Sequence, residues 1–139
     1  EVDVPLSMVR KFKETYSYVG EIESGARVKV PVEGKPRKIE IGKQVGEACN
    51  QLLDEVFSSI KKIIAVASPQ SVFAMLQNII LTGGGSRIRN FDQELQRMLA
   101  DDGYEDPEVR VSSREIKPFV AIGAFKVAKG ARGDQWIKP

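Results

Sequence analysis

Three consecutive glycines, Gly83, Gly84 and Gly85, constrain the fold of this chain more than any other feature of its sequence. The apolar run before them, at residues 78–82, is flanked by breakers, which predicts a short and largely buried strand. A turn without side chains lets a flat ligand approach the main chain closely. Strand, glycine turn and helix form a common nucleotide-binding arrangement. The same turn also serves as a tight connection, so the glycines alone leave both interpretations open.

Apolar periodicity predicts a helix, a hairpin and a long helix in the first half. A helix is expected over residues 5–16, with Asp3 as its cap. The alternation changes to a period of two over residues 26–41, which predicts a hairpin with its turn at 33–36. Residues 43–66 then form the strongest helical pattern. The apolar stripe of this long helix consists of Val45, Cys49, Leu52, Val56, Ile60 and Ile63, and it is widened by Ala48, Leu53, Phe57 and Ile64.

The second half alternates helices with short strands, as open α/β sheets do. Ser68 and Pro69 are expected to begin a helix that ends at Leu76. A second helix, over residues 90–100, has Asn90 or Asp92 as its expected cap. The remaining elements are a strand at 108–112 and a helix at 118–128, where Phe119 and Phe125 are expected in the core.

Composition excludes several classes of site. The 139 residues contain no histidine, which rules out a Ser-His-Asp triad and histidine metal ligands within this chain. The single cysteine, Cys49, lies in the apolar stripe, so we expect a buried hydrophobe in a reducing, cytoplasmic compartment. The net charge of +2 is too small to indicate nucleic acid as a partner. No apolar run has the length of a membrane helix, so no membrane insertion is expected.

Three separated motifs resemble the large-lobe half of the actin superfamily of ATPases. VRKFKETYSYV at residues 9–19 is similar to the helix whose Lys-Glu pair faces adenosine. LTGGGS at residues 81–86 is similar to the adenosine loop of the family. KPFVAIGA at residues 117–124 is similar to the late helix that closes the base side of the nucleotide pocket. Within the bacterial branch, the loop and its flanks look most like the filament-forming actins of magnetosome chains. Rod-shape and plasmid-segregation actins are the alternatives.

The resemblance implies a partial actin-like ATPase fold of the α/β class, taken from the C-terminal part of a longer protein. Residues 1–67 would be the nucleotide-capping subdomain, made of helices and a β-hairpin. Residues 68–139 would be part of the large-lobe base, with the closing helix and a tail. Because other strands of the family's sheet come from segments that are absent here, an exposed apolar sheet edge is expected.

The resemblance also implies roles for individual residues in binding ATP or ADP. Glu14 would accept hydrogen bonds from the ribose hydroxyls, and Lys13 would lay its aliphatic stem along the base. Lys117 would approach from the far side. The plainer interpretation of each is a solvated charge on a helix. The cofactor-binding candidates are Lys13, Glu14, Gly83, Gly84, Gly85, Ser86, Arg87 and Lys117.

The two glycine-containing Asp loops that hold triphosphate and magnesium in actin-type ATPases have no counterpart in this sequence. Phosphoryl transfer depends on that positioning and charge neutralisation, so the chain alone is expected not to hydrolyse ATP. The implied parent is a cytoskeletal, magnetosome-associated ATPase that assembles with copies of itself and has magnetosome proteins as further partners. A non-catalytic filament-assembly module is the alternative from a different class, and another member of the sugar-kinase and chaperone ATPase clan is a third.

Overall fold

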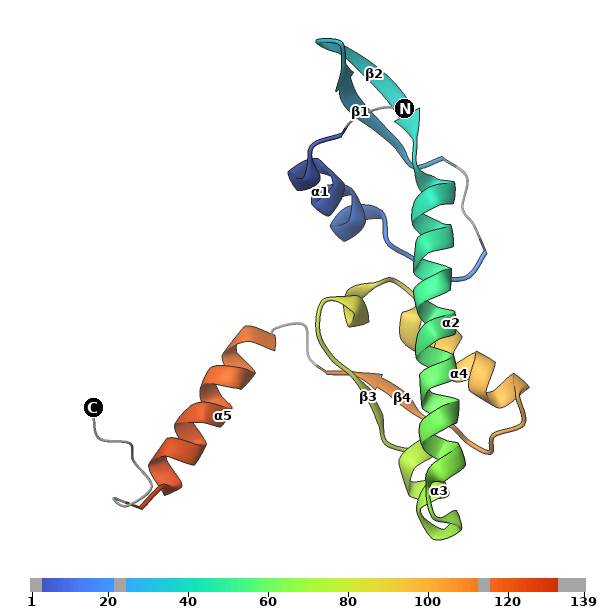
Figure 1. The fold of residues 1–139 in the computed structure, drawn as a ribbon, viewed down its shortest axis with the longest axis vertical. Coiled ribbons are helices and arrows are strands. Elements are labelled where there is room, and N and C mark those ends of the chain that lie inside the picture. Colours follow the sequence, from blue (N-terminus) through green and yellow to red (C-terminus); the bar gives the residue numbers. More distant parts are fainter. Residues whose placement is uncertain (1–3, 22–24, 113–115, 133–139) are drawn as a thin grey trace.

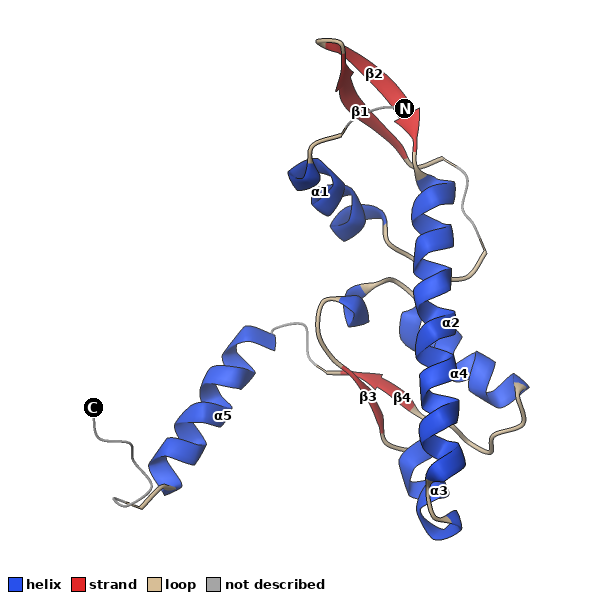
Figure 2. Ribbon diagram, in the orientation of Figure 1, coloured by secondary structure: helices blue, strands red, loops and turns tan. Residues whose placement is uncertain are grey.

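A long central helix organises the structure (Figure 1). The computed structural model describes residues 4–21, 25–112 and 116–132, without the side chains of residues 116–119. The elements, coloured by type in Figure 2, are α1 (Leu6–Tyr16), β1 (Arg27–Val32), β2 (Lys35–Glu40), α2 (Gly42–Val66), α3 (Pro69–Leu76), β3 (Ile79–Leu81), the 3₁₀ turn η1 (Gly85–Arg87), α4 (Phe91–Asp101), β4 (Val109–Val111) and α5 (Ile116–Gly130). Every helix and strand that the periodicity predicts is present. The largest shift is in the last helix, which begins at residue 116 rather than 118.

The hairpin and the second sheet each have two strands. In the hairpin, β1 and β2 run antiparallel and are joined by Glu33 and Gly34, whose φ angles of 50° and 76° are typical of a type I′ turn. In the second sheet, β3 and β4 run parallel, and α4 lies in the connection that parallel strands require. The prediction that this strand is largely buried is wrong, because Ile80 is 65% exposed and neither Ile79 nor Leu81 is buried. In the described chain each of the two strands pairs on one side only, so the expected open sheet edge is present.

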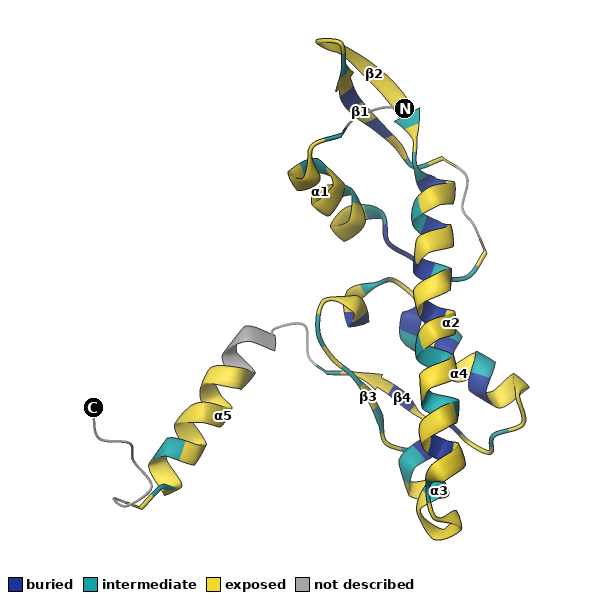
Figure 3. Ribbon diagram, viewed as in Figure 1, coloured by how far each residue is buried: buried dark blue, intermediate teal, exposed yellow. Residues whose placement is uncertain are grey.

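The hydrophobic core lies where α2 meets α4 (Figure 3). Leu95 and Leu99 of α4 are completely buried, and the segment after α1 adds Val19 to the same cluster. Burying each such side chain contributes about 1.5–3 kcal/mol. The core therefore draws on residues from both sides of position 67. Its buried members are Val19, Cys49, Leu53, Phe91, Leu95, Leu99 and Val109.

The covered face of α2 includes only part of the predicted stripe. Leu52 is 39% exposed and Ile63 is 55% exposed, so these two predicted core positions are wrong. The buried residues of α2 are Gly42, Gly46, Cys49, Leu53 and Ile64, and the last three belong to the predicted stripe. The apolar stripe on α2 is wider than its contact with α4, so the packing partner selects which of its residues are covered.

Ser68 and Asn90 occupy the predicted N-cap positions of α3 and α4, but neither side chain makes a capping hydrogen bond. Ser68 precedes α3 without a side-chain cap, since its hydroxyl lies 2.7 Å from the hydroxyl of Ser71. Asn90 precedes α4 in a left-handed conformation with φ 62°, and its carbonyl rather than its amide accepts the Glu94 N–H. Asp3 lies outside the described residues.

Helix α5 lies apart from the other elements (Figure 1), and its apolar side chains are uncovered (Figure 3). Phe125 is 68% exposed and Val120 is 72% exposed, so the predicted core position of Phe125 is wrong in this structure. The side chain of Phe119 lies outside the described residues. A helix that is apolar on most sides is normally buried. None of the helices that the structure describes combines the length and the hydrophobicity that crossing a bilayer demands.

Candidate functional site

The first sequence motif places Lys13 and Glu14 near the end of α1, and both side chains are exposed. The helix stops after Tyr16, where the Ser17 N–H donates to the Lys13 carbonyl at 3.1 Å. The Ser17 hydroxyl donates to the same carbonyl. The chain then turns inward, and Tyr18 and Val19 are buried. The Lys-Glu pair is thus presented to solvent by a helix whose exit is anchored in the protein.

The glycine motif forms a compact turn at the end of β3. Gly83 has a φ of +86°, a conformation that favours glycine, and Gly84 has helical angles at the start of η1. The Ser86 hydroxyl donates to the Gly83 carbonyl at 2.8 Å and is buried, so it holds the turn together. The Arg87 side chain is exposed.

The outer surface of this turn is open. A Cβ atom built on Gly83 or Gly84 would have no heavy atom within 4 Å, while one on Gly85 would lie 3.9 Å from Leu52 Cδ2. Gly84 therefore has neither a steric nor a conformational need to be glycine within the described chain. Such a position fits a flat group that lies directly against the main chain, as an adenine base would.

Backbone hydrogen bonds join the two motifs, which are separated by about seventy residues. The Val19 N–H donates to the Arg89 carbonyl at 3.1 Å, and the Arg89 N–H donates to the Ser17 carbonyl at 3.3 Å. These bonds form a parallel bridge between Tyr18 and Arg89. The Arg89 guanidinium also lies 5.8 Å from the centre of the Tyr18 ring. The exit of α1 is consequently held beside the exit of the glycine turn.

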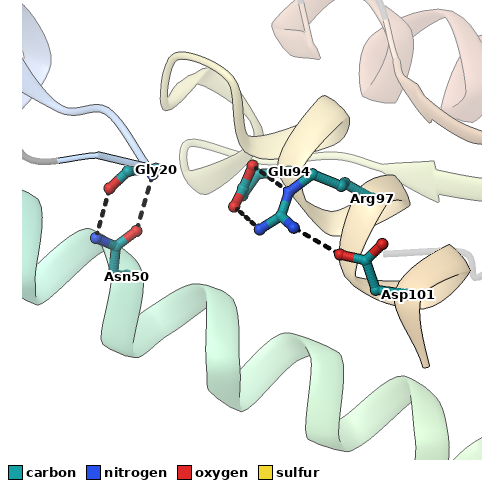
Figure 4. Close-up of polar contacts among 5 residues, drawn as sticks. All are labelled: Gly20, Asn50, Glu94, Arg97 and Asp101. Atoms are coloured by element: carbon teal, nitrogen blue, oxygen red, sulfur yellow. Dashed lines mark hydrogen bonds and ion pairs between the residues drawn. The ribbon is translucent and has the colours of Figure 1, made fainter.

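Asn50 of α2 holds the same segment from the other side (Figure 4). Its Oδ1 accepts the Gly20 N–H at 3.0 Å, and its Nδ2 donates to the Gly20 carbonyl at 3.1 Å. Sequence reasoning missed this residue. The sequence does show a side-chain amide directly after Cys49 of the apolar stripe. It could not indicate which backbone groups that amide would bind.

The structure joins the end of the first predicted motif to the segment that follows the second, and it leaves the third motif apart. The glycine turn with Ser86 and Arg87 is linked through the bridge to the exit of the helix that carries Lys13 and Glu14. Lys117 belongs to α5, and its side chain lies outside the described residues. Figure 1 draws α5 away from α1 and from the turn.

A network of charged side chains lies elsewhere, on α4 (Figure 4). Arg97 contacts Glu94 at 2.5 Å and Asp101 at 2.6 Å. The hydrogen bond from Arg97 holds the pKa of the Glu94 carboxyl below its usual value. Asp102 in turn contacts Lys61 at 2.8 Å. In the part of the chain that the structure describes, no three acidic or cysteine side chains gather as metal ligands.

Two surface hollows are lined by other residues than the glycine turn. The larger, about 830 Å³, lies between α4 and the segment leading into β4, and its lining includes Gln96, Tyr104 and Glu108. The smaller, about 230 Å³, is apolar and lies between the end of α2 and the α3–β3 connection. Neither is lined by Lys13 or Glu14.

Curated relatives of the chain include MamK and MamK-like proteins. It is 26% identical over 128 residues to a MamK-like protein of Paramagnetospirillum magneticum, an alignment that covers 92% of this chain and 37% of the relative. It is 29% identical over 106 residues to the actin-like protein MamK of Magnetospirillum gryphiswaldense, which covers 76% of this chain and 29% of the relative. The chain thus spans about a third of the length of these relatives.

Solved MamK structures have the same fold over this region. A MamK double helical filament matches with a TM-score of 0.81 and 27% identity, over 95% of this chain and 40% of the filament chain. A non-polymerising MamK mutant bound to AMPPNP matches with a TM-score of 0.77 and 26% identity, over 93% of this chain and 39% of the mutant chain. The expected partial actin-like fold is therefore confirmed.

The family model of the MreB/Mbl proteins matches residues 8–131, a range that includes all three motifs. That range extends over most of the sequence, from the Lys-Glu helix to the end of α5. The chain therefore belongs to the MreB/Mbl family of bacterial actin-like proteins.

Proposed function

We propose that this chain supplies the adenosine-side wall of the nucleotide site in a filament-forming bacterial actin-like ATPase. The observation that carries the proposal is the backbone bridge between Tyr18 and Arg89. It holds the end of the Lys-Glu helix beside the glycine turn, although about seventy residues separate them in the sequence. A nucleoside site requires that the groups which contact the ribose and the base be held at fixed positions relative to one another.

The proposed roles follow from exposure and chemistry. The carboxylate of Glu14 is exposed and accepts the hydroxyls of the ribose, while the Lys13 stem covers the sugar or the base. The open backbone at Gly83 and Gly84 contacts a face of the adenine, and Gly85 and Ser86 maintain the turn behind it. Arg87, also exposed, lies at the rim. Lys117 contributes from α5 when that helix is packed against the site.

The proposed cofactor is ATP or ADP, which agrees with the AMPPNP that is bound in one MamK neighbour. The described residues fit the nucleoside part only. Phosphates and magnesium need the two Asp-containing loops, which this sequence lacks, so the proposed chain binds nucleotide weakly and does not turn it over by itself. Phosphate release from the pure 139-residue chain above the buffer rate would refute this part.

The proposed biological role is the organisation of magnetosomes by a cytoplasmic filament. Its support is the similarity to MamK proteins and to a MamK double helical filament. Copies of the same protein are the first proposed partner, and magnetosome-associated proteins are the second. In this proposal residues 1–67 form the capping subdomain, and residues 68–139 form part of the large-lobe base with its closing helix.

A non-catalytic assembly module is the second candidate, and the uncovered apolar surface favours it. Val120, Phe125 and Val127 on α5 and Ile80 on β3 are each more than 60% exposed, as surfaces that contact another polypeptide are before assembly. A rod-shape or plasmid-segregation actin is a further alternative within the same family. The assembly module would assemble without binding nucleotide. The other actins would form a filament with a different role in the cell.

The test is a titration of a fluorescent ATP analogue into the full-length protein that carries this segment. We expect the Glu14→Ala variant to bind about tenfold to a hundredfold more weakly, because a hydrogen bond to a charged acceptor contributes about 1.5–3 kcal/mol. Glu55→Ala is the matched control, since Glu55 is an exposed glutamate on α2. Equal affinity of wild type and Glu14→Ala would refute the ribose role, and affinity lost equally in the control would show a general charge effect.

A further inference from the structure

The side-chain amide of Asn50 makes an unusual contact, because it satisfies both backbone groups of one residue. Its two hydrogen bonds to Gly20 measure 3.0 and 3.1 Å, and thirty residues separate the partners. An amide in this orientation mimics the edge of a β-strand, with one donor and one acceptor facing the main chain. Gly20 has a φ of +105°, so the backbone at this point is held in a conformation that favours glycine.

The segment between α1 and the hairpin is therefore bound on two sides. Asn50 contacts Gly20 from α2, and Arg89 contacts Ser17 and Val19 from the chain that leaves the glycine turn. Ser17, Tyr18 and Val19 are all buried between these contacts. A displacement of Gly20 consequently moves the residue pair that forms the bridge, and with it the exit of α1.

We propose that Asn50 is a positioning residue, which sets the placement of the Lys-Glu helix relative to the glycine turn. This inference rests on the proposed nucleotide function for its effect on binding, while the coupling itself is a property of the chain. Asn50 does not touch the nucleotide in this proposal. It acts through Gly20, the Tyr18–Arg89 bridge and α1.

Two variants separate the hydrogen bonds. Asn50→Ala removes both. Asn50→Asp keeps an acceptor for the Gly20 N–H but replaces the donor with an oxygen that faces the Gly20 carbonyl. Gln96→Ala is the matched control, because the Gln96 side-chain amide also binds the backbone. Its Oε1 accepts the Val109 N–H at a distance of 3.0 Å, and neither residue belongs to α1.

The first measurement is amide hydrogen exchange of the nucleotide-free 139-residue chain. We expect exchange at the amides of Val19, Gly20 and Arg89 to be at least about tenfold faster in Asn50→Ala than in Gln96→Ala, since local opening there no longer breaks the Asn50 contacts. In Asn50→Asp, which keeps the acceptor, we expect a smaller increase at the Gly20 amide. Unchanged exchange at Val19 and Arg89 in Asn50→Ala would overturn the coupling. This result does not depend on whether the protein binds nucleotide.

The second measurement is the affinity of the full-length protein for the fluorescent ATP analogue. We expect Asn50→Ala to weaken binding by about tenfold and Gln96→Ala to change it by less than about twofold. If wild type binds and Asn50→Ala binds equally well, the positioning role is overturned. If wild type does not bind, the proposed nucleotide function fails, and the exchange measurement still decides whether Asn50 couples the two segments.

Discussion

Alanine substitutions at two neighbouring glycines of the turn should change stability in opposite directions. Gly84 has φ −65° and ψ −34°, which alanine adopts without strain, and its added methyl would meet no atom within 4 Å. Gly84→Ala should therefore raise the free energy of unfolding by about 0.4–1 kcal/mol, because it restricts the unfolded chain. Gly83 has φ +86°, so Gly83→Ala should lower the free energy of unfolding by about 1–2 kcal/mol.

The two variants should consequently differ by about 1.4–3 kcal/mol, although each adds the same methyl group. Urea unfolding followed by circular dichroism measures this difference, provided that the dependence on urea is equal in the two variants. Equal destabilisation by both substitutions would refute the turn geometry on which the site is built.

The same Gly84→Ala variant also tests the ligand surface. Its methyl group projects from the open face of the turn, where the proposed adenine lies against the backbone. We therefore expect the full-length variant to be more stable and yet to bind the ATP analogue more weakly. Binding equal to that of wild type would refute contact between the base and this part of the turn.

Three further predictions concern the core, a buried hydroxyl and the charge network. Leu95→Ala should lower the free energy of unfolding by about 2–5 kcal/mol in urea unfolding, since Leu95 is completely buried, and a loss below about 1 kcal/mol would contradict its place in the core. Tyr18→Phe should raise the free energy of unfolding by about 1 kcal/mol in the same assay, because the buried Tyr18 hydroxyl has no hydrogen-bond partner among the residues that the structure describes. A loss of stability would instead indicate that the hydroxyl is satisfied in solution. The lowered pKa of Glu94 means that its interaction with Arg97 stabilises the fold above the carboxyl's ordinary pKa, and that this contribution is lost as the pH falls through the folded-state pKa. Glu94→Gln should remove that part of the acid dependence when unfolding is followed from about pH 7 to pH 3, and an unchanged profile would contradict the assignment.

Local sequence patterns predicted the elements of the fold well, because the determinants of each element lie within a few residues. The spacing of apolar residues located α2, and the change to a period of two located the hairpin. The glycine turn and the strand before it were also recognisable from residue type. The predictions that failed depended on surroundings: Leu52 and Ile63 lie at the margin of a contact whose width is set by α4, and Asn90 uses its backbone conformation rather than its side chain.

The candidate site was only partly accessible to the same reasoning. The motif similarities selected Lys13, Glu14 and the glycine turn, and they led to the family that the comparisons then established. Their spatial relation could not be derived from composition or periodicity. The roles of these residues in nucleotide binding remain predictions, as does the division of the chain at residue 67.

The sequence by itself determined the elements, the position of the glycine turn and the family resemblance, since each is encoded by neighbouring residues or by recognisable motifs. Only the tertiary structure decided that the exit of α1 pairs with the chain after the turn, and that Asn50 holds this segment from α2. The physical reason is that these contacts join residues thirty to seventy positions apart. Backbone groups and a single amide make them, and such groups acquire a particular partner only when the core of α2 and α4 has brought the segments together.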